Sequence, residues 1–373
     1  MATANGRTTN NLVIRAGARA AARLRAEGFH ADLFGTLVGA SGGAKWIVLR
    51  HLDTVLIDRL ILPRSTPIDA IGSSIGSFRH ACFAQAKPHA ALDRFDSAYV
   101  EQAYEGTVQP PQHVISEASN RILERVLGDK GAEEICSNGL VRSHVVAARL
   151  RKDRGLDRGR HFKLQLGTSA TLNVLSRRLL ARRFDRILFH TEEPGTSTKV
   201  PTESAKPFLR FDDFETHLHA LTPDRVRSAL LASGSIPLLM EGVDTVPGVP
   251  GMLFDGGIID YHFDFGFRRR KGLVLFAHFF DRIVPGWFDK PLAWRRPRPE
   301  ALEDVLMVAP SDAFIASLPG GKVPDRNDFL AFPTKERIAR WRGITEQCRV
   351  LADELDELIA TNRISEAVVP FRS

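Results

Sequence analysis

Cysteine is scarce in this chain, and so are long apolar stretches. Its 373 residues include three cysteines, none in a C-x-x-C spacing, so neither a disulfide framework nor a structural zinc site is expected. The longest apolar runs, such as Leu33–Val38 and Gly272–Phe280, are far shorter than the roughly 18 residues that a membrane-spanning helix needs. We therefore expect a reduced, cytoplasmic protein whose contact with a membrane is at most peripheral.

Acidic residues are absent from the first 26 positions, which hold five arginines but no apolar signal-peptide core. This composition is found in organelle transit peptides, and it suits equally well an Ala-rich helix over about Val13–Ala26 that is closed by Gly28. Over the whole chain Lys and Arg outnumber Asp and Glu by 51 to 44, a net charge of +7. Nucleic acid, a phospholipid surface and an acidic acyl carrier all fit that charge.

Strand and helix signals alternate between residues 31 and 86. Ala31–Gly39 has the pattern of a short apolar strand, a glycine-rich turn follows, and Lys45–Leu60 has helical spacing. Ile68–Ile71 and Ser77–Ala86 repeat the order of strand, turn and helix. Such alternation predicts an α/β fold with a mainly parallel central sheet.

Further elements follow along the chain. We predict strands over Leu140–Leu150, Phe162–Leu166, Leu253–Phe254 and Leu273–His278, and a helix over Pro223–Ala232. Lys335–Ile359 carries apolar residues three or four positions apart, which predicts a C-terminal amphipathic helix. Thr191–Lys206 is rich in Pro, Gly, Ser and Thr, and this composition makes it a candidate lid.

A G-x-S-x-G sequence, Gly72-Ser73-Ser74-Ile75-Gly76, lies between a predicted strand and a predicted helix. In a nucleophile elbow the serine occupies a strained turn, and the flanking glycines leave space while the hydroxyl projects above the sheet. The start of the helix also directs a positive dipole end toward a forming oxyanion. Ser74 is therefore the candidate nucleophile, with Gly72 and Gly76 supporting its turn. The same letters also occur in ordinary Gly/Ser-rich turns.

A second glycine turn, Ser41-Gly42-Gly43-Ala44-Lys45, lies about thirty residues before Ser74, again between strand and helix. Acyl transfer needs N–H donors directed at the carbonyl oxygen as it gains charge, and consecutive glycines present them without obstruction. A P-loop is excluded, because it needs a hydroxyl where the chain has Trp46, and G-x-G-x-x-G is absent. A plain turn between strand and helix is the other interpretation.

A third turn, Phe254-Asp255-Gly256-Gly257, ends an apolar strand in an acid and two glycines. It would bring a carboxylate to the C-terminal edge of a strand, where ligands bind in open α/β sheets. An Asp in contact with a serine hydroxyl takes its proton as a general base without an intervening imidazole. Alternatively, Asp255 merely closes a D-G turn.

In this order the three turns resemble the patatin-like phospholipase family, which has a glycine-rich oxyanion loop, a G-x-S-x-G serine and a D-G-G or D-G-A aspartate. Residues 232–237, Ala-Ser-Gly-Ser-Ile-Pro, are similar to the family's A-S-x-A-x-P segment. The resemblance extends from Ala31 to about Asp264. It implies a three-layer α/β/α patatin-like fold, with Ser74 as nucleophile and Asp255 as base. The implied oxyanion donors are Gly42, Gly43 and Ala44, and the implied supporting residues are Lys45, Gly72, Gly76, Gly256 and Gly257.

The resemblance and the sequence patterns together give an expected organisation and reaction. We expect an N-terminal helical segment over residues 1–30, a patatin-like catalytic domain over 31–285, and an extension over 286–373 whose helix packs on the core. The expected reaction is hydrolysis of lipid or fatty acyl carboxylic esters through an acyl-serine, with no cofactor and no metal. The expected partners are an acyl ester substrate and, peripherally, an anionic membrane surface, and nucleic acid is not expected. Transfer of the acyl group to another alcohol would use the same intermediate.

The chain departs from the family pattern in the oxyanion loop, which commonly reads G-G-G-x-R-G. Ser41 stands at the first glycine, Lys45 at the arginine and Trp46 at the last glycine. Lysine keeps a positive charge near the oxyanion, whereas Trp46 adds bulk.

Two other functions fit parts of the sequence. An α/β-hydrolase triad needs a histidine after the acid, and both His262 and His278 follow Asp255. His262 follows by only seven positions, however, and His278 lies in an apolar run. A noncatalytic module that binds anionic lipid would use the basic clusters at 268–271 and 295–298, which flank several aromatic residues.

Overall fold

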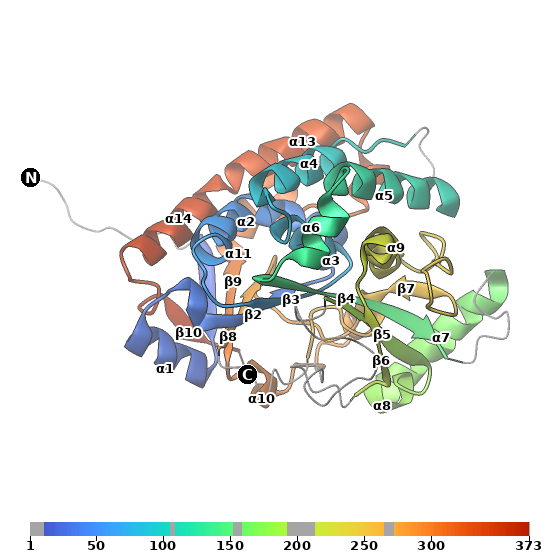
Figure 1. Ribbon diagram of the computed structural model, residues 1–373, viewed down its shortest axis with the longest axis horizontal. Coiled ribbons are helices and arrows are strands. Elements are labelled where there is room, and N and C mark those ends of the chain that lie inside the picture. The colour runs from blue at the N-terminus through green and yellow to red at the C-terminus, as the bar shows by residue number, and fades with distance from the viewer. Residues whose placement is uncertain (1–10, 105–108, 152–158, 192–212, 265–271, 373) are drawn as a thin grey trace, which may run out of the picture.

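The computed structural model describes residues 11–104, 109–151, 159–191, 213–264 and 272–372 (Figure 1). The strands are β1 (Leu12–Ala16), β2 (Phe34–Gly39), β3 (Ile68–Ser73), β4 (Val141–Leu150), β5 (Phe184–His190), β6 (Thr216–Ala220), β7 (Leu253–Asp255), β8 (Leu273–Ala277), β9 (Val305–Pro310) and β10 (Val368–Pro370). They form one sheet in the order β10-β1-β9-β8-β2-β3-β4-β5-β6, and β7 pairs with β4 beside this path. Strands from each of the three expected segments thus share one sheet.

The middle of the sheet is parallel. β2 pairs in parallel with β3 and β8, β3 with β4, and β8 with β9. Every residue of β2, β3, β8 and β9 is buried, as is usual for parallel strands that helices cover on both faces. Antiparallel pairs join β4 to β5 and β7, and β1 to β9. The chain therefore has the mixed α/β fold with a mainly parallel sheet that the alternating sequence pattern predicts.

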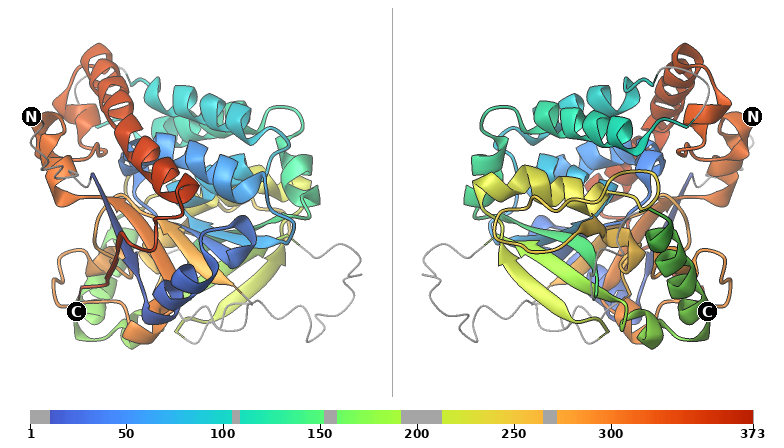
Figure 2. Two further views of the ribbon diagram at one scale, coloured as in Figure 1. Left: turned by 90° about the vertical axis from the view of Figure 1, so that its left-hand side faces the viewer. Right: turned by 90° about the vertical axis from the view of Figure 1, so that its right-hand side faces the viewer.

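Helices lie on both sides of the sheet. They are α1 (Ala18–Glu27), α2 (Arg50–Leu56), α3 (Ile75–Phe83), α4 (Pro88–Val100), α5 (Gln112–Leu127), α6 (Gly131–Ser137), α7 (Gly159–Leu175), α8 (Arg177–Leu180), α9 (Pro223–Gly234), α10 (Pro299–Leu302), α11 (Asp312–Ser317), α12 (Asp328–Ala331), α13 (Thr334–Gln347) and α14 (Arg349–Ala360). Figures 1 and 2 show α3 to α6 and α13 on one side, and α1 and α8 on the other. The helix α3 packs directly on β2, β3 and β4, and α4 packs on α3.

Short helical turns complete the fold. They are η1 (Ala31–Leu33), η2 (Gly43–Leu49), η5 (Gly256–Ile258), η6 (Trp287–Asp289) and η7 (Pro319–Gly321), with a π-helical turn η3 (Ile57–Ile61) after α2. Two of these, η2 and η5, begin at glycines that the sequence analysis assigns to the site.

The strand β4 changes its partner along its length. Its first part pairs with β3, where Ser73 lies opposite Val146, and the next residue, Ala147, pairs with Asp255 of β7. Because β3 runs parallel and β7 antiparallel to β4, the C-terminal ends of β3 and β7 meet along one edge of β4. This register brings together the segments that carry Ser74 and Asp255.

The first element of the chain is a strand, so the helix expected over Val13–Ala26 is wrong at its start. Leu12–Ala16 pairs with β9 and β10, and α1 begins only at Ala18. Leu12, Ile14 and Ala16 are buried, and β1 lies between β9 and β10, both of which come from the last seventy residues of the chain. No local pattern reveals such a distant partner.

The segment Phe162–Leu166, expected as a strand, lies instead in the helix α7. Phe162, Leu166, Ser169 and Asn173 are buried, and their spacing of three and four positions is helical. The buried face includes two polar residues, which obscured the helical period in the sequence.

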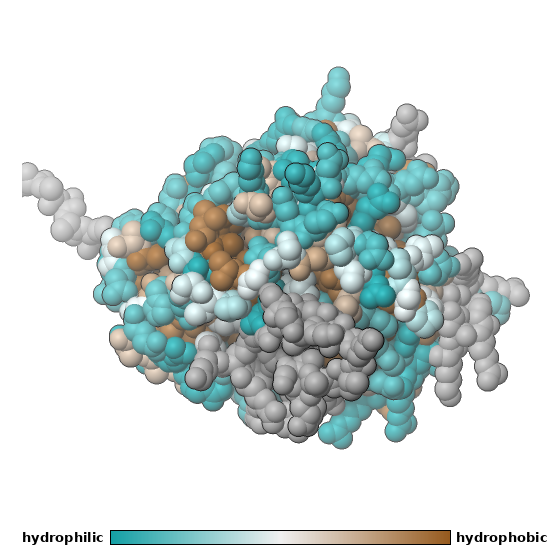
Figure 3. All heavy atoms as spheres, in the orientation of Figure 1, coloured by the Kyte–Doolittle hydropathy of each residue, from teal (hydrophilic) through white to brown (hydrophobic). Residues whose placement is uncertain are grey.

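The C-terminal segment Lys335–Ile359, expected as one helix, forms the two consecutive helices α13 and α14, which meet at Cys348. Trp341 and Leu351 are among its buried residues. None of the helices in the described ranges is long and apolar enough to cross a membrane. Polar residues cover much of the face drawn in Figure 3, and the apolar residues there form small separate groups.

Candidate active site

Ser74 occupies a strained turn between β3 and α3. Its backbone has φ 53° and ψ −130°, a conformation that residues with a side chain rarely adopt. A Cβ on Gly72 would lie 2.6 Å from the Ser77 nitrogen, and one on Gly76 would overlap the Gly39 carbonyl group. Both flanking positions therefore have room only for glycine.

Two further serines hold this turn in place. The Ser74 N–H points at Ser233, with its carbonyl oxygen at 3.1 Å and its hydroxyl at 2.9 Å. The Ser233 hydroxyl donates to the Val146 carbonyl of β4 at 2.6 Å, and the Ser77 hydroxyl donates to the Ser74 carbonyl at 2.6 Å. Sequence reasoning reached Ser233 only through a family resemblance and missed Ser77, because a serine early in a helix gives no particular signal.

Asp255 contacts the Ser74 side chain directly. The Ser74 Oγ donates to Asp255 Oδ2 at 2.6 Å, and the Gly257 N–H donates to Asp255 Oδ1 at 2.7 Å. Burial raises the pKa of the Asp255 carboxyl to about 6, although its hydrogen bonds with Ser74 and Gly257 and the charge of Lys290 oppose the rise. A carboxylate with this pKa is ionised at neutral pH and is a better proton acceptor than an ordinary aspartate.

The glycines after Asp255 are required by contact. A Cβ on Gly256 would overlap the Val146 carbonyl, and one on Gly257 would lie 2.5 Å from the Ser41 hydroxyl. The D-G-G sequence thus lets the chain turn closely against both β4 and the loop after β2.

That loop contains the candidate oxyanion donors. Gly42 is extended at φ 177°, and Gly43 has a positive φ of 55°. Gly43 and Ala44 begin the turn η2, and the first N–H groups of such a turn have no acceptor within it. The Ser41 N–H donates to the Tyr261 carbonyl at 2.8 Å, which ties the loop to the segment that follows Asp255.

Trp46 does not obstruct this loop, contrary to the bulk expected from the sequence. Its ring is fully buried and stacks on Phe95 of α4 at 4.4 Å between ring centres. The preceding Lys45 is mostly buried, and burial lowers the pKa of its ammonium group. No ion pair joins Lys45 to a carboxylate in the described ranges.

Lys290 adds a second cation, which the sequence analysis missed. Its Nζ lies 4.0 Å from the centre of the Tyr261 ring, over the ring face. Its side chain keeps an exposed surface, yet loss of hydration, followed by the charges of Lys45 and Arg326, lowers its pKa to about 7. Asp255 and Lys290 therefore influence each other's ionisation.

The two histidines of the alternative triad are engaged elsewhere. His262 Nδ1 accepts from the Val284 N–H at 2.9 Å, and His278 Nδ1 lies 2.6 Å from the Phe280 carbonyl oxygen. Both rings are buried, and burial lowers both pKa values. Among the described residues, the hydrogen-bond partner of the Ser74 hydroxyl is Asp255 and not a histidine.

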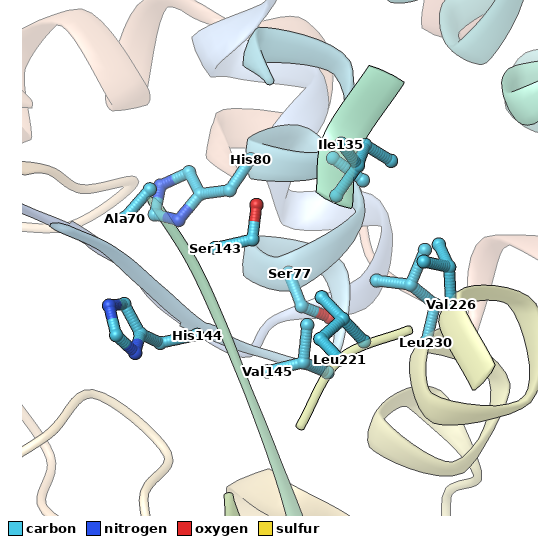
Figure 4. Close-up of a pocket in the computed structure, with 11 residues that line it drawn as sticks. Ala70, Ser77, His80, Ile135, Ser143, His144, Val145, Leu221, Val226 and Leu230 are labelled. Carbon is cyan, nitrogen blue, oxygen red and sulfur yellow. The ribbon is translucent and has the colours of Figure 1, made fainter. Parts of the chain in front are cut away.

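A small cavity lies between α3, α6, α9 and the strands β3 and β4 (Figure 4). It has room for about one water molecule. His80 and Ser143 line it, and neither His80 ring nitrogen nor the Ser143 hydroxyl has a hydrogen-bond partner in the described part of the chain. The cavity is too small for an acyl ester, so it is not the substrate site. No cluster of possible metal ligands occurs among the described residues.

Comparisons with known proteins give little guidance. No family model matches this chain, and no curated protein matches it. One solved structure similar to it is VipD from Legionella pneumophila, at a TM-score of 0.31 and 12% identity, over 95% of this chain and 72% of VipD. Similarity at that level does not establish a shared family.

The lid candidate at 191–206 lies outside the described residues except for Thr191, as does the basic cluster at 268–271.

Proposed function

We propose that this protein is a serine acyl hydrolase that cleaves lipid or fatty acyl esters, with Ser74 as nucleophile and Asp255 as general base. The observation that carries the proposal is the 2.6 Å hydrogen bond between Ser74 Oγ and Asp255 Oδ2 at a strained turn. Backbone strain and a buried carboxylate both cost stability, and a fold keeps such features mainly where chemistry needs them.

The geometry supports a reaction in two stages. Ser74 Oγ attacks the ester carbonyl carbon while its proton passes to Asp255, and the N–H groups of Gly43 and Ala44 stabilise the oxyanion. The intermediate collapses to an acyl-Ser74 ester, and the leaving alkoxide takes the proton from Asp255. A water molecule then attacks the acyl carbon and gives a proton to Asp255. The bond between this carbon and Ser74 Oγ breaks, Ser74 Oγ takes the proton back from Asp255, and the fatty acid leaves.

This dyad favours a patatin-like, three-layer architecture over an α/β-hydrolase. The order of oxyanion loop, serine and aspartate along the chain matches the first, and the direct contact between Ser74 and Asp255 leaves no place for an intervening imidazole. The same acyl-enzyme would allow transfer to another alcohol, and water is the simplest acceptor.

Hydrolysis of p-nitrophenyl esters tests the proposal. We expect Ser74→Ala and Asp255→Asn to lower kcat at least 1,000-fold, on the order of the losses seen when a nucleophile or its base is removed. Ser137→Ala, which changes an exposed serine of α6, should leave kcat unchanged. A series of acyl chain lengths would define the acyl preference, and circular dichroism would check folding.

The pH dependence gives a second test of the same assignment. Because the base must be ionised, kcat/KM should fall as pH drops through the Asp255 pKa of about 6. Full activity in either folded variant would remove that residue from the mechanism, and an inactive wild type would favour the noncatalytic module.

We also propose that the substrate comes from an anionic lipid surface that contacts α7 and the residues beside it. Leu164 and Leu175 of α7 are 66% and 73% exposed, and Trp294 is 67% exposed. The Arg295 side chain donates to the Asn173 carbonyl at 2.9 Å, which places Trp294 near the end of α7. Exposed apolar and aromatic residues suit the interface of a bilayer.

Cations surround this surface. Arg178, Arg182 and Arg296 are exposed and form no ion pair with a described residue, so their charge is available to phosphate groups. The surface also leads toward the dyad, because Asn173 of α7 donates to Asp289 at 2.6 Å and Lys290 follows directly. Lys290 in turn is near enough to Asp255 to influence its ionisation.

Sedimentation with vesicles checks this surface. Binding to vesicles that contain phosphatidylserine should exceed binding to pure phosphatidylcholine, and Leu175→Ser with Trp294→Ser should weaken it at least 5-fold. Leu330→Ser changes an equally apolar exposed residue of α12, which is 49% exposed, and serves as the matched control. Equal loss in the control, or none in the double variant, would refute the assignment of this surface.

A further inference from the structure

A chain of buried hydroxyl groups leads away from Asp255, and the proposed reaction leaves it unused. Ser41 Oγ and Ser73 Oγ lie 2.8 Å apart, and Ser73 Oγ donates to the Asp260 carbonyl oxygen at 2.6 Å. Ser41 is 2% exposed and Ser73 is fully buried. Buried hydroxyl groups need hydrogen-bond partners within the protein, so the acceptor of each hydroxyl proton can be sought among the neighbouring groups.

Ser41 also lies beside the catalytic carboxylate. A Cβ on Gly257 would lie 2.5 Å from Ser41 Oγ and 2.9 Å from Asp255 Oδ1, so both oxygens border the same small space. The Ser41 hydroxyl is also among the groups that lower the pKa of Asp255. The second glycine of the D-G-G turn thus leaves the hydroxyl and the carboxylate free to approach each other.

The Ser41 hydroxyl has two possible acceptors for its one proton. Ser73 donates to the Asp260 carbonyl oxygen, which cannot donate in return, so Ser41 is the donor when a proton lies between Ser41 and Ser73. The Ser41 proton can point to Ser73 or to Asp255, but not to both. An ionised carboxylate is a stronger acceptor than a hydroxyl group, so it favours donation from Ser41 to Asp255.

Resting on the proposed function, we propose that Ser41 is a positioning residue for the general base. Its hydroxyl donates to Asp255 while the carboxylate is ionised, and turns to Ser73 once the carboxylate has taken the Ser74 proton. Ser41 stands where the patatin-like loop has a glycine, so the device belongs to this chain's own departure from that pattern.

Four other groups also lie close to the Asp255 carboxyl, and a test of Ser41 has to leave them unchanged. Lys290 is the cation that lowers its pKa, and Tyr261 is a buried phenol close enough for Asp255 to raise its pKa in turn. Ser74 and Gly257 complete the hydrogen bonds to the carboxylate. Substitution of Ser41 leaves these four neighbours of Asp255 unchanged.

The test is a direct titration of Asp255 by NMR, in protein carrying aspartate labelled with 13C at the carboxyl carbon. The Asp255 signal is assigned by its absence in Asp255→Asn. We expect Ser41→Ala and Ser41→Gly to raise its pKa by about one unit, the size expected for loss of one hydrogen bond to a charged group. Ser77→Ala is the matched control, because Ser77 is equally buried and contacts Ser74 without touching Asp255.

The pH profile of kcat/KM in the same variants separates this proposal from the hydrolase assignment. A raised Asp255 pKa in both Ser41 variants, with Ser77→Ala unchanged, supports the role of Ser41 whether or not the protein cleaves the esters tested. An unchanged pKa overturns it even if hydrolysis is fast. A purely structural role for Ser41 would lower the melting temperature and leave the titration midpoint where it is.

Discussion

Asp255→Asn should make the folded protein more stable at neutral pH while it abolishes hydrolysis. The carboxyl is buried and its pKa is raised to about 6 from an ordinary value of 3.8. A raised pKa for an acid means that the fold disfavours the ionised form, so ionised Asp255 opposes folding. An asparagine amide at this position keeps hydrogen bonds to Ser74 and Gly257 without a charge.

The size of the effect follows from the linkage between proton binding and folding. Below the ordinary pKa, Asp255 is protonated in both states and costs nothing. As pH rises from 3.8 to about 6, the unfolded chain releases the proton that the folded chain still holds, and stability falls. Above about pH 6 the full cost, about 3 kcal/mol, is present. The advantage of Asp255→Asn should therefore grow with pH and level off above pH 7.

Urea denaturation at pH 4, 6 and 8 measures this directly, with the free energy of unfolding of wild type and variant compared at each pH. Asp32→Asn is a control of opposite sign, because hydrogen bonds from Ser65 and Thr66 lower the Asp32 pKa below its ordinary range. The ionised Asp32 carboxylate stabilises the fold at pH values above its ordinary pKa of 3.8, and this stabilisation is lost only as the pH falls below that value. An Asp255→Asn advantage that is absent at pH 8, or that does not change with pH, would refute the reasoning.

Two further changes test the loop and the sheet. Gly42→Ala should lower kcat in the ester assay on the order of 100-fold, because its Cβ would lie 2.5 Å from the Phe279 ring and force the oxyanion loop to move. Gly139 has open space around it, so the control Gly139→Ala should leave kcat unchanged. Arg186→Met should lower the free energy of unfolding by about 3–5 kcal/mol, because it removes one partner of a fully buried pair with Asp260 at 2.6 Å. Urea denaturation measures that loss, and a change below about 1 kcal/mol would count against a structural role for the pair.

The strand, turn and helix around Ser74 can be predicted from the sequence because their requirements are local. Gly72 and Gly76 must be glycine for steric reasons that arise within a few residues and one neighbouring strand. The short turn at Asp255 is likewise set by its own two glycines. The alternation of strands and helices before residue 90 is also local, and it predicts the parallel centre of the sheet correctly.

Other parts depend on contacts that the sequence does not display. β1 becomes a strand because β9 and β10 lie beside it, although its residues run into an Ala-rich helix. Lys290 follows η6, and its ammonium group lies over the Tyr261 ring, from where its charge lowers the pKa of Asp255; no local sequence pattern indicates this placement. In the sequence Ser41 shows only as a departure from the patatin-like loop pattern, because its closeness to Ser73 and Asp255 follows from the register of three strands.

The change of partner along β4 also has a consequence for folding kinetics. Ser74 and Asp255 are 181 positions apart, and they meet only after β3 and β7 have both docked on the same strand. Contacts between such distant residues form late, because the long intervening chain must first be closed into a loop. During refolding, esterase activity should therefore return after the helical circular dichroism signal, and the lag would measure the time that β7 takes to pair with β4.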